Sequence, residues 1–250
     1  MGNESASEGP TNPFAVLILV ARPAAGKSEI IDYLQKTDPE ARRARFHVGE
    51  LDVIDDFPML WTWFEEDDIL SRMGKPRLHS DEEGYFKYPY LWNVLIERLS
   101  LEYGKSLRDR HDYHDHFTTL IEFSRGVEHG GYCEAFSHLS EDILQRAAIV
   151  YVKVSFAESL RKNRHRFNPD RPDSILEHAL PDHKVERLYR EDDWEEFTAT
   201  APEFVKVKGT RVPYVVFENE DDVTTARGGA LGKRLEEVLG RLWMLVNANE

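Results

Sequence analysis

The sequence contains very little cysteine, no long apolar run and few basic residues relative to acidic ones. Its single cysteine, Cys133, excludes an internal disulfide framework and is typical of a protein that works in a reducing compartment such as the cytoplasm. No apolar run approaches the roughly 20 residues that a membrane-spanning helix needs, so no membrane association is expected. The 250 residues include 46 Asp and Glu against 32 Lys and Arg, a formal net charge of −14. Such an acidic chain is not expected to bind nucleic acid, which requires clustered positive charge.

The length of the chain fits one α/β domain with insertions. Residues 1–13 are polar and rich in Gly, Ser, Asn and Pro, so we expect a disordered lead-in before a domain at 14–250. Strands are predicted for the apolar segments 14–20, 45–48, 117–123, 147–154 and 212–218, and helical patterns lie between them. The alternation predicts a three-layer α/β fold with about five parallel strands and helices on both faces.

The most informative segment directly follows the first predicted strand. Residues 21–28 have the sequence A-R-P-A-A-G-K-S. A strand, a tight loop, Gly-Lys-Ser and a helix in this order match the phosphate-binding P-loop, although Ala21 stands where the strict pattern has Gly. Backbone N–H groups of such a loop and helix converge on phosphate, while Lys27 would contact the phosphates and Ser28 would ligate Mg²⁺. The predicted nucleotide-binding residues are Pro23, Ala24, Ala25, Gly26, Lys27, Ser28 and Glu29. The alternative is an ordinary β–turn–α unit with a chance lysine.

A second motif ends the strand predicted at 117–123. Residues 120–125, L-I-E-F-S-R, combine a strand, an acid and a trailing arginine. Together with the P-loop they resemble the nucleoside monophosphate kinases, although Glu replaces Asp and the usual Gly and Pro of that motif are missing. The resemblance implies a P-loop NTPase fold in which Glu122 helps Ser28 to hold Mg²⁺ and Arg125 binds the phosphate of the acceptor. For Arg125 the alternative is a surface ion pair.

The resemblance also directs attention to three acids after the predicted strand 45–48. In P-loop kinases the end of the second strand faces the acceptor, and a carboxylate there can take the proton of an attacking hydroxyl. We therefore predict Asp52 as a catalytic base and Asp55 as a substrate contact, with Asp56 as a further candidate. The alternative is an acidic cluster that caps a helix or forms a turn. Residues 57–116, rich in aromatics, are predicted as a helical acceptor-binding insertion.

The most basic stretch of the chain follows the strand predicted at 147–154. Arg161 and Arg164 are three residues apart and so share a helix face, and Arg166 and Arg171 extend the cluster. In the resembled kinases a lid, a segment that closes over the phosphates, stands here and excludes water. We therefore predict 161–197 as lid-like, with Arg161 and Arg164 as catalytic residues. A solvated helix face paired with nearby acids is the alternative.

These features together predict an ATP-dependent phosphotransferase that uses Mg²⁺ and transfers phosphate to a nucleotide or another small molecule. Asn219, after the last predicted strand, corresponds to the loop that borders adenine in many of the resembled kinases. One alternative is a regulatory protein that hydrolyses ATP or GTP to switch a partner, although the guanine-reading Asn-Lys-x-Asp motif is missing. Another is a catalytically inactive scaffold that binds nucleotide.

Overall fold

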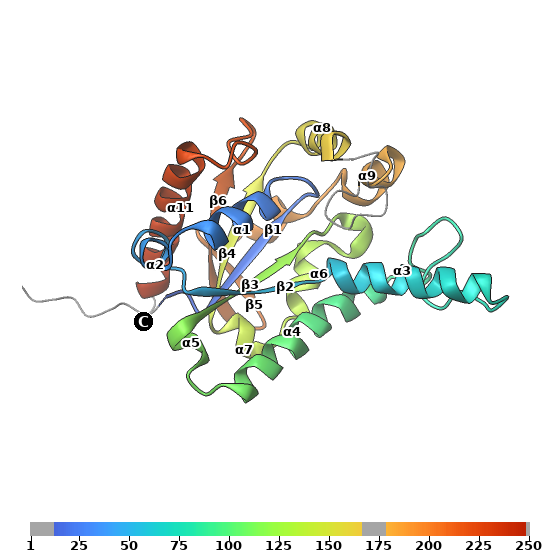
Figure 1. The fold of residues 1–250 in the computed structure, drawn as a ribbon, viewed down its shortest axis with the longest axis horizontal. Helices are drawn as coiled ribbons and strands as arrows, with labels where there is room; N and C mark the ends of the chain where they lie inside the picture. The colour runs from blue at the N-terminus through green and yellow to red at the C-terminus, as the bar shows by residue number, and fades with distance from the viewer. Residues whose placement is uncertain (1–12, 167–178, 249–250) are drawn as a thin grey trace, which may run out of the picture.

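A six-stranded sheet lies at the centre of the computed structural model, which describes residues 13–166 and 179–248 (Figure 1). The strand order is β2-β3-β1-β4-β6-β5, in which β5 alone runs antiparallel to its neighbour. The strands are β1 Val16–Ala21, β2 Glu50–Asp55, β3 Phe117–Phe123, β4 Ala147–Lys153, β5 Phe204–Val207 and β6 Thr210–Glu218. The α/β fold with about five parallel strands predicted from the sequence is thereby confirmed.

Helices cover both faces of the sheet because the central strands are apolar on both sides. Every residue of β1 is buried, and successive side chains enter opposite cores: Ile18 packs into one and Leu19 into the other. The first core is closed by α4 Leu91–Asp109, α6 Gly131–Ser137, α7 Glu141–Leu144 and α10 Trp194–Thr198. The second is closed by α1 Lys27–Lys36, α2 Pro39–Phe46 and α11 Gly229–Asn247. The result is three layers, as Figure 1 shows.

The prediction of a strand at 45–48 is wrong. Phe46 ends α2, and the second strand begins at Glu50. The helix starts at Pro39, where Asp38 accepts hydrogen bonds from the amides of Glu40 and Ala41 and so caps the helix. The true strand pairs only with β3 and is an edge strand, which explains why it tolerates acidic residues.

A second difference concerns the far edge of the sheet. The segment 204–207, too short to be predicted as a strand, pairs with β6 through a two-residue turn at Lys208 and Gly209. Both turn residues have positive φ, 49° and 85°, the geometry that favours tight hairpins. The hairpin makes β5 the last strand of the sheet.

The predicted acceptor-binding insertion, 57–116, has two different parts. α4 belongs to the core of the sheet, with Leu95 and Leu99 buried, and the short helix α5 Tyr113–His116 leads into β3. α3 Phe57–Arg72 instead projects beyond the sheet (Figure 1). Its buried Asp67 accepts hydrogen bonds from the amides of Leu78, His79 and Ser80 and so ties the following loop to the helix.

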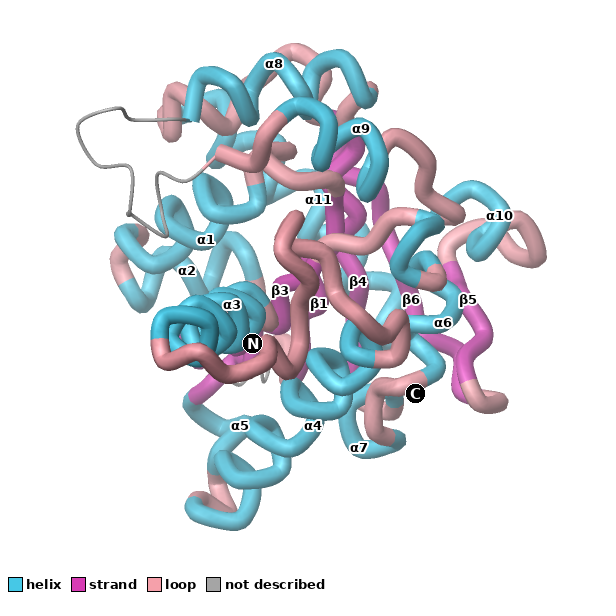
Figure 2. The backbone as a smooth tube through the Cα atoms, turned by 90° about the vertical axis from the view of Figure 1, so that its right-hand side faces the viewer, coloured by secondary structure: helices cyan, strands magenta, loops and turns pink. Residues whose placement is uncertain are grey.

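Two helices lie side by side at the edge where the parallel strands end, α8 Phe156–Arg166 and α9 Asp182–Tyr189 (Figure 2). Both fall in the segment predicted to be lid-like, 161–197, which also includes the start of α10 in the core of the sheet. Residues 167–178 of that segment, with Arg171, lie outside the described residues. The predicted lead-in also lies outside them except for Pro13. Within the ranges that the structure describes, no helix combines the length and apolar character needed to cross a bilayer.

Candidate active site

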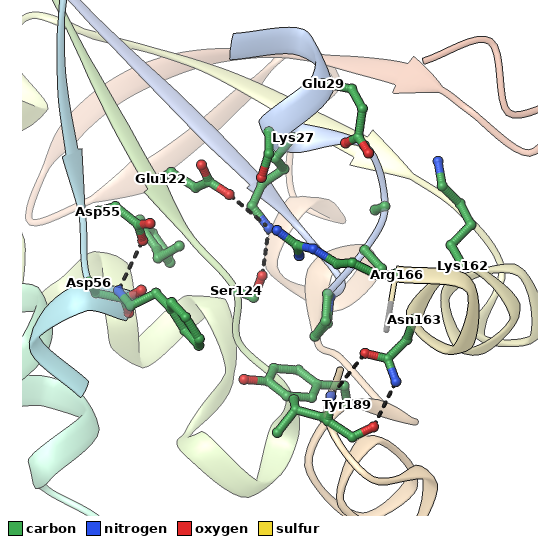
Figure 3. Close-up of a pocket in the computed structure, with 18 of the residues that line it drawn as sticks. Lys27, Glu29, Asp55, Asp56, Glu122, Ser124, Lys162, Asn163, Arg166 and Tyr189 are labelled. Carbon is green, nitrogen blue, oxygen red and sulfur yellow. Dashed lines mark hydrogen bonds and ion pairs between the residues drawn. The ribbon is translucent and has the colours of Figure 1, made fainter. Parts of the chain in front are cut away.

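A cavity of about 430 Å³ opens where β1, β2 and β3 end, between the loop after β1 and the helices α8 and α9 (Figure 3). The carboxyl ends of parallel strands meet at one edge of a sheet, which is where α/β proteins commonly bind ligands. The cavity is lined by the segments 23–29, 55–58 and 122–125, and by residues of α8 and α9. The predicted P-loop therefore forms one wall of the cavity.

Side chains from distant parts of the chain position the P-loop. Ser159 of α8 donates a hydrogen bond to the carbonyl of Pro23 (2.8 Å), and Asn219 after β6 donates to the carbonyl of Ala25 (2.7 Å). Arg22 forms an ion pair with Asp192 at 2.8 Å. These contacts fix the backbone of a loop that has no regular secondary structure.

The conformation of the loop depends on Gly26. Its φ is +113°, and a Cβ there would lie 2.5 Å from Thr224 Oγ1 and 2.7 Å from Asn219 Nδ2. Ala24 also has positive φ, 55°. α1 begins directly after Gly26 without a side-chain cap, so the first amides of the helix stay available to an anion in the cavity.

Lys27, the first residue of α1, is buried in the wall of the cavity. Its Nζ donates to Ser124 Oγ at 2.7 Å and lies 3.6 Å from Glu122 Oε1 (Figure 3). Burial raises the pKa of the Glu122 carboxyl, whereas the positive charges of Lys27 and Arg166 act in the opposite direction. The ammonium group is thus close to the first turn of α1 and beside a carboxylate.

Asp55 lies opposite Glu122 in the pairing of β2 with β3. Its carboxylate accepts a hydrogen bond from the amide of Phe57 at 3.0 Å, at the start of α3. Burial and the neighbouring charges of Glu122 and Asp56 raise the pKa of Asp55 to about 7. A carboxyl group in this state can take up a proton near neutral pH.

Arg125 is almost fully buried and not part of a surface ion pair. Its guanidinium contacts Asp56 at 2.6 Å, the carbonyl of Ser124 at 2.7 Å and that of Trp92 at 3.2 Å. It also lies over the ring of Trp92, 5.2 Å from the centroid. Desolvated ion pairs of this kind need good geometry to offset the loss of hydration, and Asp56 provides it.

Asp52 does not reach the cavity. Because β2 runs from Glu50 to Asp55, Asp52 lies in the middle of the strand instead of after it. Its carboxylate accepts hydrogen bonds from Tyr113 at 2.5 Å and from Ser106 at 3.2 Å, on the α4 side of the sheet. The error follows from the misplaced strand, and Asp55 occupies the position that we had expected for Asp52.

The helix α8, predicted to be part of a lid, presents a different face to the cavity from the one that we predicted. Arg164 is exposed and pairs with Asp182 at 2.7 Å, and it is not among the described residues that line the cavity. Arg161 lines the cavity, but its guanidinium pairs with Glu158 and Asp222. Arg166 instead extends from α8 toward Lys27, as Figure 3 shows.

The sequence contained a signal for this face. Lys162 and Arg166 are four residues apart, a spacing that also shares a helix face. Lys162 is buried and donates to Asp222 at 2.5 Å and to Thr224 at 3.1 Å. Charge alone does not distinguish this pair from Arg161 and Arg164, because the distinction depends on which side of α8 packs against the loop after β6.

Asn219 has a role that sequence analysis missed. Its side chain is buried and contacts the carbonyl of Ala25 and Thr224 Oγ1 (2.8 Å). In the described part of the chain it lies behind the P-loop and does not line the cavity. Asn219 therefore supports the loop from behind.

The protein is thus an α/β protein with a mostly parallel sheet, whose first strand leads through this braced loop into a helix that begins with Lys27 and Ser28. Three solved structures have similar folds over nearly their whole length. They are shikimate kinase from Acinetobacter baumannii in complex with shikimate (14% identity, TM-score 0.40, 96% of this chain and 96% of that chain), APE1195 (15%, 0.38, 92% and 98%) and TT1252 from Thermus thermophilus (14%, 0.39, 96% and 98%). No model of a known family matches the sequence, and no curated protein does either.

Proposed function

We propose that the protein is an ATP-dependent phosphotransferase that uses Mg²⁺ and acts on a small-molecule acceptor. The observation that supports this proposal is the placement of Lys27. Its side chain leaves the first residue of the uncapped helix α1, and its ammonium group contacts Ser124 and Glu122 in the cavity wall. Asp55, at the end of β2, and Arg125, just after β3, line the same cavity. Such a site offers amides and a cation to the phosphates on one side and a base or a cation to the acceptor on the other.

The nucleotide side would use the residues that line the P-loop wall. Amides of residues 26–29 would bind the phosphates of ATP, and Lys27 would place its charge on them. Ser28 and Glu122 would hold Mg²⁺ directly or through water, since Mg²⁺ needs only one or two protein ligands beside the phosphates. When bound there, the ion would reduce the negative charge that opposes the attack of the acceptor.

The acceptor side offers two modes of action. For a hydroxyl acceptor, Asp55 would orient the hydroxyl and take its proton, which its pKa of about 7 favours near neutral pH. For a phosphate acceptor no base is required, and Arg125 would bind the anion while Asp56 keeps the guanidinium in position. Arg166 would add positive charge on the α8 side.

We expect that Arg166→Ala lowers the rate of phosphoryl transfer by more than about tenfold and leaves ATP affinity within about twofold, because its charge acts mainly on the transferring group. Arg164→Ala is the matched control: the same helix and the same residue type, but paired with Asp182 outside the cavity. It should retain the native rate. Steady-state ADP release with a coupled assay measures both. If Arg164→Ala were slow and Arg166→Ala kept the native rate, the face of α8 that carries Arg164 would be the one that acts on the ligand.

The proposal as a whole is tested by screening hydroxyl- and phosphate-bearing compounds for stimulated ADP release with Mg²⁺ present. Stimulation by one compound class, with transfer of label from the γ-phosphate of ATP to that compound, is expected. The rate with a hydroxyl acceptor should rise with pH through about 7, since Asp55 acts only when it has lost its proton, whereas a phosphate acceptor should show no such rise. ADP release that responds to no compound, but only to a protein partner, would instead support a regulatory switch.

A further inference from the structure

A second cavity of about 440 Å³ adjoins the active-site cavity. It lies between α3, the loop before α4 and the helix α9. The two cavities have several wall residues in common: Phe57, Leu60, Trp92, Leu180 and Tyr189. The two cavities therefore lie next to each other, and the size of the second is within the range of sites that bind small organic ligands.

We propose that this second cavity receives the non-reacting part of the acceptor, and that this part is a flat aromatic group with an anionic substituent. The identification of this ligand as the acceptor rests on the proposed function, whereas the preference of the cavity for an aromatic anion rests on its walls alone. Neither Asp55 nor Arg125 lies in its walls as described, so it is distinct from the reacting end of the site.

The aromatic preference follows from the walls. Phe86 contacts Phe64 and Trp92 in edge-to-face geometry, with ring centroids 5.4 and 4.7 Å apart. Tyr85 and Tyr189 add two further rings to the walls. Aromatic walls held by mutual contacts offer flat apolar surfaces at fixed angles, which suit a planar ring better than a flexible polar chain.

The anionic preference follows from the charges at the rim. Lys184 and Arg187 lie one turn apart on α9, over the ring of Tyr85 at 5.0 and 4.2 Å from its centroid. Lys184 Nζ otherwise donates only to a neutral carbonyl, that of Gly84, at 3.2 Å among the contacts described. The charges of Asp81 and Glu83 act on Lys184, but neither carboxylate is among its described hydrogen-bond or ion-pair partners.

Three acids lie in the same walls, and each has a described partner, although the partner of Glu65 is a neutral ring in the same wall. Glu65 accepts from Trp61 Nε1 at 2.9 Å, and Asp68 pairs with Arg77 at 2.7 Å. Glu128 approaches Arg187 only to 3.9 Å, and both side chains are half exposed. Such a pair is weak, so a bound anion can compete for Arg187.

Two fluorescent probes with the same rings test this proposal: anilinonaphthalene sulfonate, which is anionic, and neutral phenylnaphthylamine. The native protein should bind one equivalent of each, the sulfonate about fivefold more tightly, since each half-exposed ion pair contributes up to about 1 kcal/mol. The double variant K184Q/R187Q should bind both probes equally. Arg190→Gln is the matched control, an exposed arginine of the same region that pairs with Glu186, and should keep the preference.

A second variant tests the location. Leu188→Trp places a large side chain in the cavity wall and should weaken both probes by more than about tenfold through steric exclusion, with ATP binding by calorimetry unchanged. Equal native affinities for the two probes, or binding unaffected by Leu188→Trp, would overturn the proposal. If the probes behave as expected but the native protein fails to bind ATP, the proposed phosphotransfer is wrong while the aromatic site remains.

Discussion

Replacing Lys27 by alanine should lower the rate of phosphoryl transfer by about 10³, the effect of removing one preorganised charge from a site that excludes water. Lys27 is buried, and its ammonium group lies 3.6 Å from Glu122. Without it, the phosphates of ATP would lose the one cationic side chain of the segment 23–29 and would face the negative charges of Glu122 and the adjoining acids. ATP affinity measured by calorimetry should therefore also fall below detection.

The matched control for this experiment is Lys36→Ala. Lys36 lies in the same helix, is exposed and pairs only with Asp32 among the contacts described. Surface pairs of this type contribute at most about 1 kcal/mol, so the control should keep native stability, ATP affinity and rate. Circular dichroism and thermal unfolding establish that both variants are folded. Native-like ATP binding by a folded Lys27→Ala protein would contradict the placement of the nucleotide.

The strand, loop and helix at 14–35 could be predicted from the sequence because their signals are local. A fully apolar strand, a short loop and Gly-Lys-Ser stand within fifteen residues of one another, and the structure places them as expected. Glu122 could be predicted for the same reason, since it lies near the end of a buried strand that pairs with β1. Side chains at the carboxyl ends of adjacent parallel strands meet without further information.

The part of the cavity wall at Asp55 and Asp56 could not be predicted as well, because it follows an edge strand. Central strands such as β1 are apolar throughout, whereas β2 pairs on one side only and includes Glu50 and Asp52. Its pattern therefore resembled a loop, and the adjoining segment at 45–48 was taken for the strand. The later strand places Asp52 in the middle of β2 instead of at its end beside the cavity, and its carboxylate accepts a hydrogen bond from Tyr113 on the α4 side of the sheet.

Long-range contacts explain the remaining differences. Asn219 is 194 residues from Ala25 along the chain, yet its amide bonds the carbonyl of the loop. The face of α8 that meets the cavity is likewise decided by Asp222 and Thr224, which bind Lys162. No local pattern contains such pairings, and they determine which of several equally charged residues can approach a ligand.

The contacts of Asn219 and Thr224 behind the loop also predict a large loss of stability when Gly26 is replaced. Gly26→Ala should destabilise the protein by about 2–5 kcal/mol, the sum of the strain of a positive φ and of overpacking. The new Cβ would lie within 2.7 Å of both Asn219 Nδ2 and Thr224 Oγ1, and these atoms are held by further hydrogen bonds to Ala25 and Lys162. Because the clash can be relieved only by moving the loop, ATP affinity should be lost as well.

Gly74→Ala separates the two contributions. Gly74 also has positive φ, +67°, but nothing in the described structure lies within 4 Å of a Cβ placed there. This variant should lose about 1 kcal/mol from backbone strain alone and keep its ATP affinity. Urea unfolding of the two variants and calorimetry with ATP measure the difference. Equal losses of stability would mean that the P-loop has room for a side chain, and a loop with such room would not be shaped closely around phosphate.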